Sequence, residues 1–270
     1  MSVAHAFTAT NGEAYEIHMG RWSKRLAEVF LDFAGVAEGE QVLDLGCGTG
    51  SLTFALAQRV EKQTIVGVDL SEAYVEHARS LTDNPQIQFR VGDATAIPVP
   101  DDSVDRVLSL LLLSFVEDTQ GALTEMKRIA RPGSTIAAAI WDTMGGHVTN
   151  RIFWDAAAVF DPHANELRKT NYTRPMTQPG ELAGAWQQAG LENVEEGMLA
   201  VRMNFESFDD FWLPNLGKQG PIADYVDSLE PEAFDKLRGH LREAYLGGYD
   251  DGPRSFAGVA WCVKGTMPKA

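Results

Sequence analysis

Three alternate glycines follow an apolar run near residue 42, a pattern that suits a cofactor-binding loop. Val42-Leu43-Asp44-Leu45 leads directly into Gly46-Cys47-Gly48-Thr49-Gly50, and a helical pattern follows. Glycines let the backbone turn sharply and approach a ligand, and the N–H groups that begin the next helix face the turn. An ordinary strand-to-helix turn could use the same residues, so the loop alone does not identify a ligand.

The spacing of the glycines helps to choose between cofactors. A dinucleotide fingerprint places glycine at the first, third and sixth positions, whereas Ser51 stands at the sixth position here. Asp44 precedes the first glycine by two residues. Its carboxylate would repel a pyrophosphate but would attract a ligand that carries an ammonium group. This pattern favours S-adenosylmethionine.

A second acid ends the next apolar run, Thr64 to Asp69, and Ser71 follows it. A carboxylate at the carboxyl end of a strand can accept hydrogen bonds from both hydroxyls of a ribose, as in other nucleoside-binding open sheets. Asp and Ser are also favoured as helix caps, and the two roles can coexist. Asp69 is therefore a candidate ligand of a ribose.

The runs VLDLGCGTG (42–50), VDLS (68–71) and Val91-Gly92-Asp93-Ala94 together resemble the class I S-adenosylmethionine-dependent methyltransferases. The resemblance extends from about Tyr15 to Trp141 and is to the small-molecule branch, similar to enzymes of ubiquinone and menaquinone biosynthesis. It implies that Asp93 binds the exocyclic amine of adenine and that the Ala94 N–H binds a ring nitrogen. The cofactor-binding residues expected from the motifs and the resemblance are Tyr15, Met19, Arg21, Asp44, Gly46, Cys47, Gly48, Asp69, Leu70, Gly92, Asp93, Ala94 and Leu110. The product would be S-adenosylhomocysteine.

In this family the segment before the first strand folds over the cofactor. Tyr15 to Trp22 is rich in aromatic and sulfur side chains, so we expect a lid here. A helix that packs on the sheet edge without touching a ligand is the alternative. Leu26, Val29, Phe30 and Phe33 then recur at helical spacing and predict one buried face.

Strand and helix patterns alternate through the first half of the chain, which predicts an α/β fold with a doubly wound, mostly parallel sheet and a ligand crevice at the carboxyl ends of its strands. After the strand before Gly46 and the strand that ends at Asp69, further strands are expected at Gln86–Val91, Asp105–Leu110 and Ser134–Trp141. Helices are expected from the glycine loop to about Val60, from Glu72 to about Leu81 and over Gly121–Ala130.

The second half is less regular. We expect helices at Asn150–Phe160 and Glu181–Ala189, an irregular segment with three prolines at Asp161–Gly180, and a sixth strand at Val194–Asn204. The resemblance implies an antiparallel seventh strand, which Phe256–Thr266 fits. The expected organisation is therefore one Rossmann-like methyltransferase domain over residues 1–270. It contains a helical lid region in 1–40 and a helical insertion at 205–254, with a helix from about Pro231, over the substrate pocket.

The acceptor is defined less sharply than the cofactor. Aromatic side chains in the second half suggest an apolar or aromatic acceptor, although the same residues could simply form the core of the insertion. Ser109-Leu110-Leu111-Leu112 stands where amide and nucleobase methyltransferases carry an Asn-Pro-Pro-Tyr or Asp-Pro-Pro-Tyr motif. The atom that accepts the methyl group can therefore be an oxygen, a carbon or a nitrogen of a small metabolite, with oxygen or carbon preferred.

Methyl transfer from a sulfonium is an in-line displacement, so alignment of the two reactants can supply most of the acceleration. A base is needed only where the acceptor is protonated in its ground state. His147, in the loop after the fifth strand, and His18, in the lid, are the two candidate bases. A solvated loop histidine is the alternative for His147.

Composition limits the possible partners. The 270 residues carry a formal charge of -15, which disfavours a nucleic-acid substrate. Cys47 and Cys262 are too few for a disulfide framework or a metal site. Neither a signal-peptide pattern nor a run of about 20 apolar residues is present, so we expect a cytoplasmic protein without a membrane span. A monomer and a homodimer are both possible.

Two other classes of function fit parts of the pattern. A non-catalytic protein that binds S-adenosylmethionine for regulation would need the same cofactor loop. A nicotinamide-dependent oxidoreductase would also use a glycine loop after a strand, but Ser51 and Asp44 argue against it.

Overall fold

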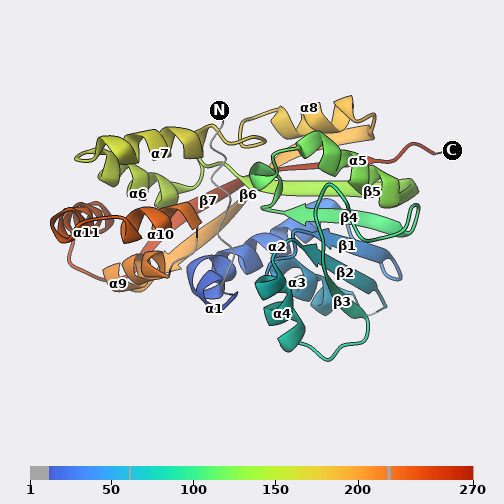
Figure 1. Cartoon of the computed structure of the whole chain (residues 1–270), viewed down its shortest axis with the longest axis horizontal. Helices are drawn as coiled ribbons and strands as arrows, with labels where there is room; N and C mark the ends of the chain where they lie inside the picture. Colours follow the sequence, from blue (N-terminus) through green and yellow to red (C-terminus); the bar gives the residue numbers. More distant parts are fainter. Residues whose placement is uncertain (1–11, 61, 218–219, 270) are drawn as a thin grey trace.

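The computed structural model describes residues 12–60, 62–217 and 220–269, so residues 1–11 of the expected lid region lie outside the described part. The described strands form a seven-stranded sheet with the order β3-β2-β1-β4-β5-β7-β6 (Figure 1). The strands are β1 (Gln41–Leu45), β2 (Thr64–Asp69), β3 (Ile87–Val91), β4 (Val104–Leu110), β5 (Ala130–Trp141), β6 (Glu192–Phe205) and β7 (Arg254–Thr266).

Strands β1 to β5 are parallel, and β7 runs antiparallel to both of its neighbours, β5 and β6. The predicted fold class is confirmed, including the antiparallel seventh strand. The strand order reverses at β1, which pairs with β2 on one side and β4 on the other. This switch point is where an open α/β sheet forms its ligand crevice.

Helices cover both faces of the sheet (Figure 1). The helices on one face are α2 (Arg21–Ala34), α3 (Ser51–Arg59) and α4 (Glu72–Ser80), and those on the other are α5 (Thr119–Ile129) and α8 (Glu181–Gln188). Neighbouring residues of β4 show the alternation: Leu108 packs in the same cluster as Leu26 of α2, whereas Val107 packs with Met126 of α5. Burying such a side chain contributes about 1.5–3 kcal/mol to the free energy of folding. Because helices cover both faces of these strands, apolar residues are favoured at consecutive positions, which explains their continuous apolar runs.

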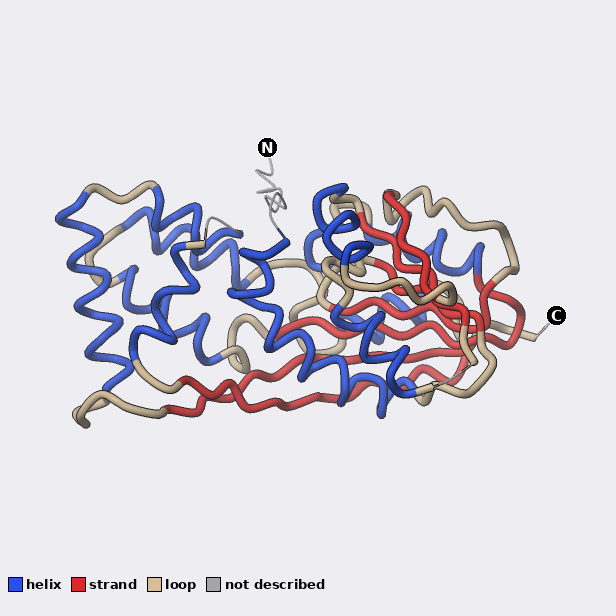
Figure 2. The backbone as a smooth tube through the Cα atoms, turned by 90° about the horizontal axis from the view of Figure 1, so that it is seen from below, coloured by secondary structure: helices blue, strands red, loops and turns tan. Residues whose placement is uncertain are grey.

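More helices gather beyond the carboxyl ends of the strands and form a helical end of the molecule (Figures 1 and 2). They are α6 (Val148–Ala158), α7 (Pro162–Tyr172), α9 (Phe208–Trp212), α10 (Gly220–Asp227) and α11 (Pro231–Leu246). The long strands β6 and β7 extend from the sheet into this end (Figure 2). There the rings of Phe205, Phe211, Tyr245 and Phe256 form one cluster, in which the centroids of the contacting pairs are 5.3–6.1 Å apart.

The N-terminal segment enters the sheet domain through three consecutive helical pieces. α1 (Gly12–Tyr15) runs into a π-helical turn, η1 (Glu16–Gly20), and then into α2. The predicted buried face of α2 is formed: Leu26 and Phe30 are fully buried, and Val29 and Phe33 pack against the same cluster. π-Helical turns are rare in proteins, and many of those that do occur lie at functional sites.

The prediction that Asp161–Gly180 is irregular was wrong over its first half, where α7 forms. The side chain of Asp161 accepts a hydrogen bond from the N–H of His163 at 2.8 Å, and Pro162 occupies the first turn. A proline in that position costs no hydrogen bond, because the first N–H groups of a helix have no partner within the helix. Pro162 therefore starts a helix instead of preventing one.

Strand β5 begins at Ala130, four residues earlier than expected. Its pairing with β4 shifts register between Val104 and Arg106, and Gly133 adopts a positive φ of 82°. The residues Arg131-Pro132-Gly133 thus form an irregular entry into the strand.

Within the described residues, no helix combines the length and apolar composition that a membrane span requires.

We expect the ion pair between Arg106 and Glu40 to be essential for stability. The Arg106 guanidinium has an exposed side-chain fraction of 8%. It donates two hydrogen bonds of 2.7 Å to Glu40 and one to the carbonyl of Ala34. Glu40→Ala should lower the free energy of unfolding by about 3–5 kcal/mol, because a buried charge loses its partner. Urea denaturation measures this. Glu166→Ala, which breaks an exposed pair with Lys169, is the control and should leave the midpoint nearly unchanged. Equal midpoints for both variants would contradict the expectation.

Candidate functional site

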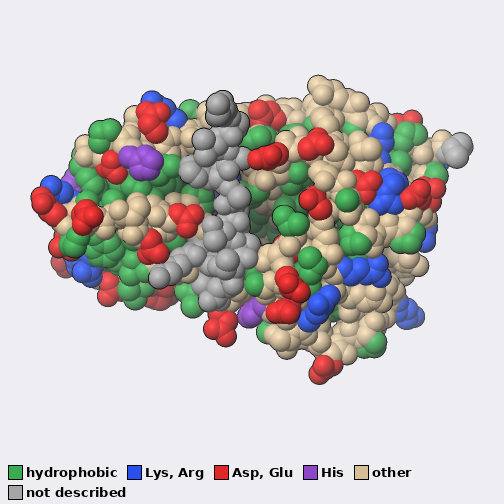
Figure 3. All heavy atoms as spheres, in the orientation of Figure 1, with side chains coloured by type: hydrophobic (Ala, Val, Ile, Leu, Met, Phe, Trp, Pro, Cys, Tyr) green, Lys and Arg blue, Asp and Glu red, His purple; other side chains and the backbone are tan. Residues whose placement is uncertain are grey.

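A cavity of about 870 Å³ lies between the carboxyl ends of the strands and the helical end. Figure 3 shows the hollowed face of the molecule, with hydrophobic side chains around the hollow. All of the predicted cofactor residues line the cavity except Asp44 and Cys47, and both candidate histidines line it too. The two ends of this cavity differ in chemistry, and each is built by a different part of the chain.

The glycine loop forms one end. Gly46, Gly48 and Gly50 have φ values of 76°, 53° and 94°, a region that favours glycine. A Cβ atom on Gly46 would lie 2.7 Å from the side chain of Leu112, and one on Gly50 would lie 2.5 Å from the ring of Phe54. No atom would contact a Cβ at Gly48 within 4 Å. The first and third glycines are thus required by packing and backbone conformation, and the middle one leaves open space beside the loop.

Asp69 connects this loop to the next helix. Its Oδ2 accepts a hydrogen bond of 2.8 Å from the N–H of Gly48, and its Oδ1 accepts one of 2.9 Å from the N–H of Ser71. Ser71 in turn caps α4 by accepting from the N–H of Tyr74. Each carboxylate oxygen keeps a second lone pair, so Asp69 can still accept hydrogen bonds from the hydroxyls of a ribose. Burial raises the pKa of Asp69 despite these bonds.

The segment after β3 supplies the adenine candidates. Asp93 is exposed, and its Oδ1 accepts hydrogen bonds from the N–H and the hydroxyl of Thr95, at 2.8 and 2.7 Å. These bonds hold the pKa of Asp93 below its usual value. The carboxylate therefore remains charged, and its Oδ2 is left as an acceptor for an amine.

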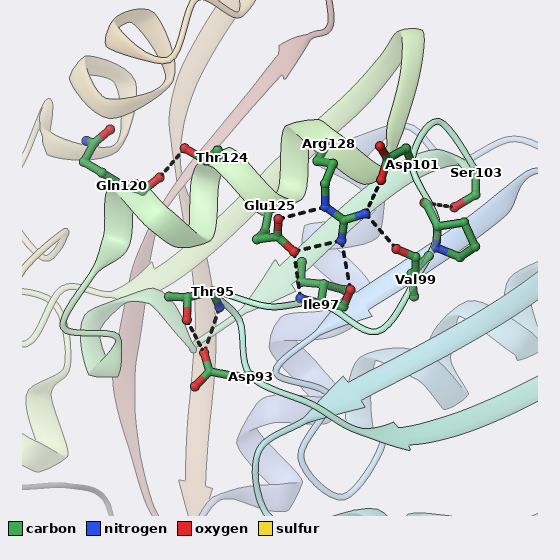
Figure 4. A network of polar contacts seen from close by, with 11 residues as sticks. Asp93, Thr95, Ile97, Val99, Asp101, Ser103, Gln120, Thr124, Glu125 and Arg128 are labelled. Atoms are coloured by element: carbon green, nitrogen blue, oxygen red, sulfur yellow. Dashed lines mark hydrogen bonds and ion pairs between the residues drawn. The ribbon is translucent and has the colours of Figure 1, made fainter.

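Figure 4 shows what fixes this segment in place. Arg128 of α5 donates to the carbonyls of Ile97 and Val99, both at 2.9 Å, and pairs with Asp101 and Glu125. Glu125 also accepts the N–H of Ile97 at 2.8 Å. A single guanidinium thus ties the loop between β3 and β4 to the helix behind it. Sequence reasoning did not identify this contact.

Asp44 and Cys47 lie behind the loop instead of on the wall of the large cavity. The side chain of Asp44 is fully buried, and its Oδ2 accepts a hydrogen bond of 2.7 Å from the hydroxyl of Thr53. Its Oδ1 has no hydrogen-bond partner among the described residues. Asp44 lines a separate cavity of about 30 Å³, which has room for one small polar group. Burial raises the pKa of Asp44 to about 7, with a further contribution from the charge of Asp69. Burial also raises the pKa of the Cys47 thiol, so it is not a reactive nucleophile.

Two contacts anchor the N-terminal segment over the cavity. Glu16 accepts a hydrogen bond of 2.5 Å from the hydroxyl of Thr49 in the glycine loop. Arg21, predicted to bind cofactor, lines the cavity but donates to both carboxylate oxygens of Asp210, at 2.9 and 3.1 Å. Met19 also lines the cavity. The segment thus contacts the glycine loop at one point and the helical end at another.

The two histidines have opposite hydrogen-bonding roles. Nδ1 of His18 lies 3.3 Å from the carbonyl oxygen of Pro214, which can only accept, so we infer that Nδ1 carries the proton and Nε2 has the lone pair. Nδ1 of His147 accepts the N–H of Asn150 at 3.2 Å, so the proton of neutral His147 is on Nε2. Burial lowers the pKa of both rings, and that of His147 to about 4, so both are neutral near pH 7.

His147 is therefore not a solvated loop residue. It is 8% exposed, caps the start of α6 and packs edge-on against Trp141, with ring centroids 4.9 Å apart. In this tautomer it can donate a hydrogen bond to a ligand but cannot take a proton from one through Nε2. The geometry favours His18 over His147 as the base.

The other end of the cavity is aromatic. Its wall includes Trp22, Phe153, Trp154, Phe205 and Phe211, which come from α2, α6, β6 and α9. All five side chains are buried, and they belong to the same hydrophobic cluster. The alternative that these residues are core is therefore correct as well, because the core of the helical end forms the wall of the cavity.

The sheet order, the glycine loop, the acid that ends β2 and the acid that follows β3 are those of a class I methyltransferase, and comparisons with known proteins agree. The family described as "Methyltransferase domain" matches residues 43–138. The chain is 38% identical over 189 residues to the 2-phytyl-1,4-naphtoquinone methyltransferase of Thermosynechococcus vestitus, covering 64% of this chain and 84% of that protein. It is 30% identical over 218 residues to the malonyl-[acyl-carrier protein] O-methyltransferase of Serratia marcescens, covering 74% and 83%. The chain belongs to the class I S-adenosylmethionine-dependent methyltransferase family, which confirms the predicted family and its cofactor.

Other relatives are matched over less of their length. A 37.1 kDa protein in transposon TN4556 of Streptomyces fradiae is 36% identical over 151 residues, which is 55% of this chain but 40% of that protein. Mycobacterial relatives are matched over 44% of their length. The chain thus spans less than half of these proteins.

Solved structures support the fold alone, because their sequences are distant. Phosphoethanolamine N-methyltransferase 2 of Haemonchus contortus, in complex with phosphomonomethylethanolamine and S-adenosylhomocysteine, has a TM-score of 0.60 and 15% identity, covering 96% of this chain and 57% of that one. The YcgJ protein of Bacillus subtilis has a TM-score of 0.57 and 16% identity, covering 91% and 99%.

The raised pKa of Asp44 generates a prediction about pH. If the ammonium group of the cofactor reaches Asp44, binding requires the carboxylate form, and this form is lost as the pH falls below about 7. Affinity for S-adenosylhomocysteine should then weaken by up to about tenfold per pH unit below 7. Calorimetry between pH 5.5 and 8 measures this. Asp44→Asn should bind more weakly at pH 8 and lose the pH dependence, and an affinity independent of pH in the unmodified chain would rule the contact out.

Proposed function

We propose that the chain transfers the methyl group of S-adenosylmethionine to an oxygen, carbon or nitrogen atom of a small apolar or aromatic metabolite. The observation that carries the proposal is the continuity of the cavity. One cavity of about 870 Å³ includes the glycine loop and Asp69 at one end and the aromatic wall at the other. This volume lies near the top of the range of about 300–1,000 Å³ for ligand sites, so it suits two ligands in contact.

The cofactor end would hold S-adenosylmethionine, which supplies a methyl group on a sulfonium. Asp69 would accept the ribose hydroxyls, and Asp93 and the Ala94 N–H would bind the adenine. Gly46 and Gly48 would allow the backbone of the loop to approach the amino-acid part. Leu70, which is 70% exposed, and Leu110 would then contact the apolar faces of the ligand.

The acceptor would lie against the aromatic wall. The helical end, with the insertion at 205–254, contributes Phe205, Phe211, Pro214 and Ile222 to this wall, which supports its assignment as a cap over the acceptor. The wall excludes water and holds a flat apolar molecule by burial and ring stacking. In-line alignment of acceptor and methyl group is then the main source of acceleration.

His18 would remove the proton where the acceptor atom is a hydroxyl or an acidic carbon. Its Nδ1–H is fixed on the carbonyl of Pro214, which orients Nε2 as the free acceptor. The lowered pKa keeps the ring neutral, as a base must be before it reacts. His147 would donate through Nε2–H and so hold an oxygen of the acceptor.

The relatives are consistent with an oxygenated acceptor. One is a methyltransferase of a phytyl naphthoquinone, and another methylates an oxygen of a malonyl group on acyl-carrier protein. Both are methyltransferases, and their names give different acceptors. The acceptor of this chain therefore depends on its own cavity wall and not on the family.

Methyl transfer from labelled S-adenosylmethionine to a panel of phenols, naphthols and quinols tests the proposal. His18→Ala should lower the single-turnover rate by about 10²-fold or more while the affinity for S-adenosylhomocysteine is unchanged, because general bases contribute about 10²–10⁴. His147→Asn is the matched control, since asparagine can also cap a helix, and it should lose less. Near-normal turnover in His18→Ala would remove the base assignment. A chain that binds S-adenosylhomocysteine but methylates no compound would favour a non-catalytic binding protein.

A further inference from the structure

Arg174 lies on the wall of the cavity in the segment between α7 and α8. Its guanidinium carbon is 4.5 Å from the centroid of the Phe115 ring, at the carboxyl side of β4. The side chain is partly buried, and burial lowers its pKa, although a guanidinium remains charged at any physiological pH. The cavity wall therefore carries a permanent positive charge at this position.

This charge has no anionic partner among the described residues. Every other arginine in the described ranges donates to a protein oxygen or pairs with a carboxylate. Arg151 and Arg168, on the neighbouring helices α6 and α7, both pair with Asp155. Glu117 and Asp118 line the cavity too, but neither pairs with Arg174, and Asp118 accepts the N–H of Gly121 at 2.8 Å.

The absence of a partner is unusual in a chain with a formal charge of -15. Removing a cation from water is unfavourable unless a compensating group binds it. Carboxylates are abundant in this protein, yet none in the described ranges forms an ion pair with Arg174, and burial lowers its pKa. A ligand that brings the missing anion would explain the arrangement.

The backbone around Arg174 is held in one conformation. The hydroxyl of Thr177 donates to the carbonyl of Arg174 itself at 2.7 Å, and Nε2 of Gln178 donates to the carbonyl of Tyr172 at 3.0 Å. Thr177 is fully buried. Met176 has a φ of 64°, a backbone conformation that is unfavourable for residues other than glycine. These contacts fix the backbone from which the Arg174 side chain extends over Phe115.

The rest of the cavity wall determines what kind of anion fits. Arg21 is the other arginine on the wall, and it is already bound to Asp210. The neighbouring amide of Asn171 is also engaged, because its Nδ2 donates to Oδ1 of Asn150 at 2.8 Å. Arg174 is therefore the arginine on the described cavity wall that no described protein carboxylate binds.

We propose that Arg174 binds an anionic group of the methyl acceptor, so that the acceptor is an aromatic or polycyclic apolar molecule with a carboxylate or another oxyanion. The inference rests on the proposed function, since it concerns the acceptor end of the same cavity. A guanidinium can bind a carboxylate through two parallel hydrogen bonds, which fixes the direction of the acceptor as well as its charge. Arg174 is thus a specificity residue and not a group that takes part in methyl transfer.

Two fluorescent probes with the same aromatic framework test the charge preference. 8-Anilinonaphthalene-1-sulfonate carries an anion, and N-phenyl-1-naphthylamine does not. Both are titrated into the chain saturated with S-adenosylhomocysteine. Arg174→Gln should weaken binding of the sulfonate by about 10- to 100-fold, as expected for loss of a hydrogen-bonded charge. It should change binding of the uncharged probe by less than about twofold.

Two further variants separate the charge from folding and from net charge. Arg174→Lys keeps the positive charge and should retain most of the preference for the sulfonate. Arg238→Gln removes an arginine of α11 that does not line the cavity and whose nearest carboxylate oxygen is 3.7 Å away, so both affinities should stay unchanged. Equal losses for the two probes in Arg174→Gln, or a loss in Arg174→Lys as large as in Arg174→Gln, would overturn the proposal.

Matched aromatic acids and their amides distinguish this inference from the proposed function. Methylation of the acids in preference to the amides, lost in Arg174→Gln, would support both. Methylation without any preference for the acids would overturn the role of Arg174 and leave the methyltransferase activity standing. Selective binding of the sulfonate probe without methylation of any compound would support the anion site and count against the activity.

Discussion

The carboxylate of Asp69 is the constraint on which the cofactor end depends. By accepting the N–H groups of Gly48 and Ser71, it joins the loop after β1 to the start of α4. The N–H groups of Gly46 and Cys47 both donate to the carbonyl of Val68, one residue earlier on β2. Hydrogen bonds from within the protein therefore hold the loop in this conformation. This arrangement brings a cost, because Asp69 lies close enough to raise the pKa of Asp44.

The second constraint joins the two ends of the cavity. η1 contacts the glycine loop through Glu16 and Thr49, and the following residue, Arg21, contacts α9 through Asp210. His18 lies between these two contacts and donates to the carbonyl of Pro214 in η3 (Leu213–Leu216). A movement of this segment would therefore change the position of His18, the glycine loop and the aromatic wall together.

Local features could be predicted from the sequence, and contacts between distant residues could not. The glycine spacing, Asp69 at a strand end and the alternation of strands and helices are all encoded within short windows. The protonation of His18 depends on a carbonyl 196 positions away, and no pattern around residue 18 indicates it. α7 was missed because a proline can either interrupt a helix or occupy its first turn. The capping contact of Asp161 shows that Pro162 occupies the first turn of α7. Arg174 could not be distinguished from the other arginines by sequence, because what sets it apart is that no described carboxylate pairs with it.

The two ends of the cavity are therefore built from different kinds of groups. The cofactor end is built from backbone groups and short-range contacts, which tolerate wide changes in sequence, and distant proteins share its fold. The aromatic end is built from side chains of α2, α6, β6 and α9, which come from distant parts of the chain and pack in one cluster. Because the same aromatic residues form both the core and the wall, a change in the shape of this wall would require repacking of the helical end. An unpaired charge on that wall is easier to alter than the core, so Arg174 is the point at which specificity could change without loss of the fold.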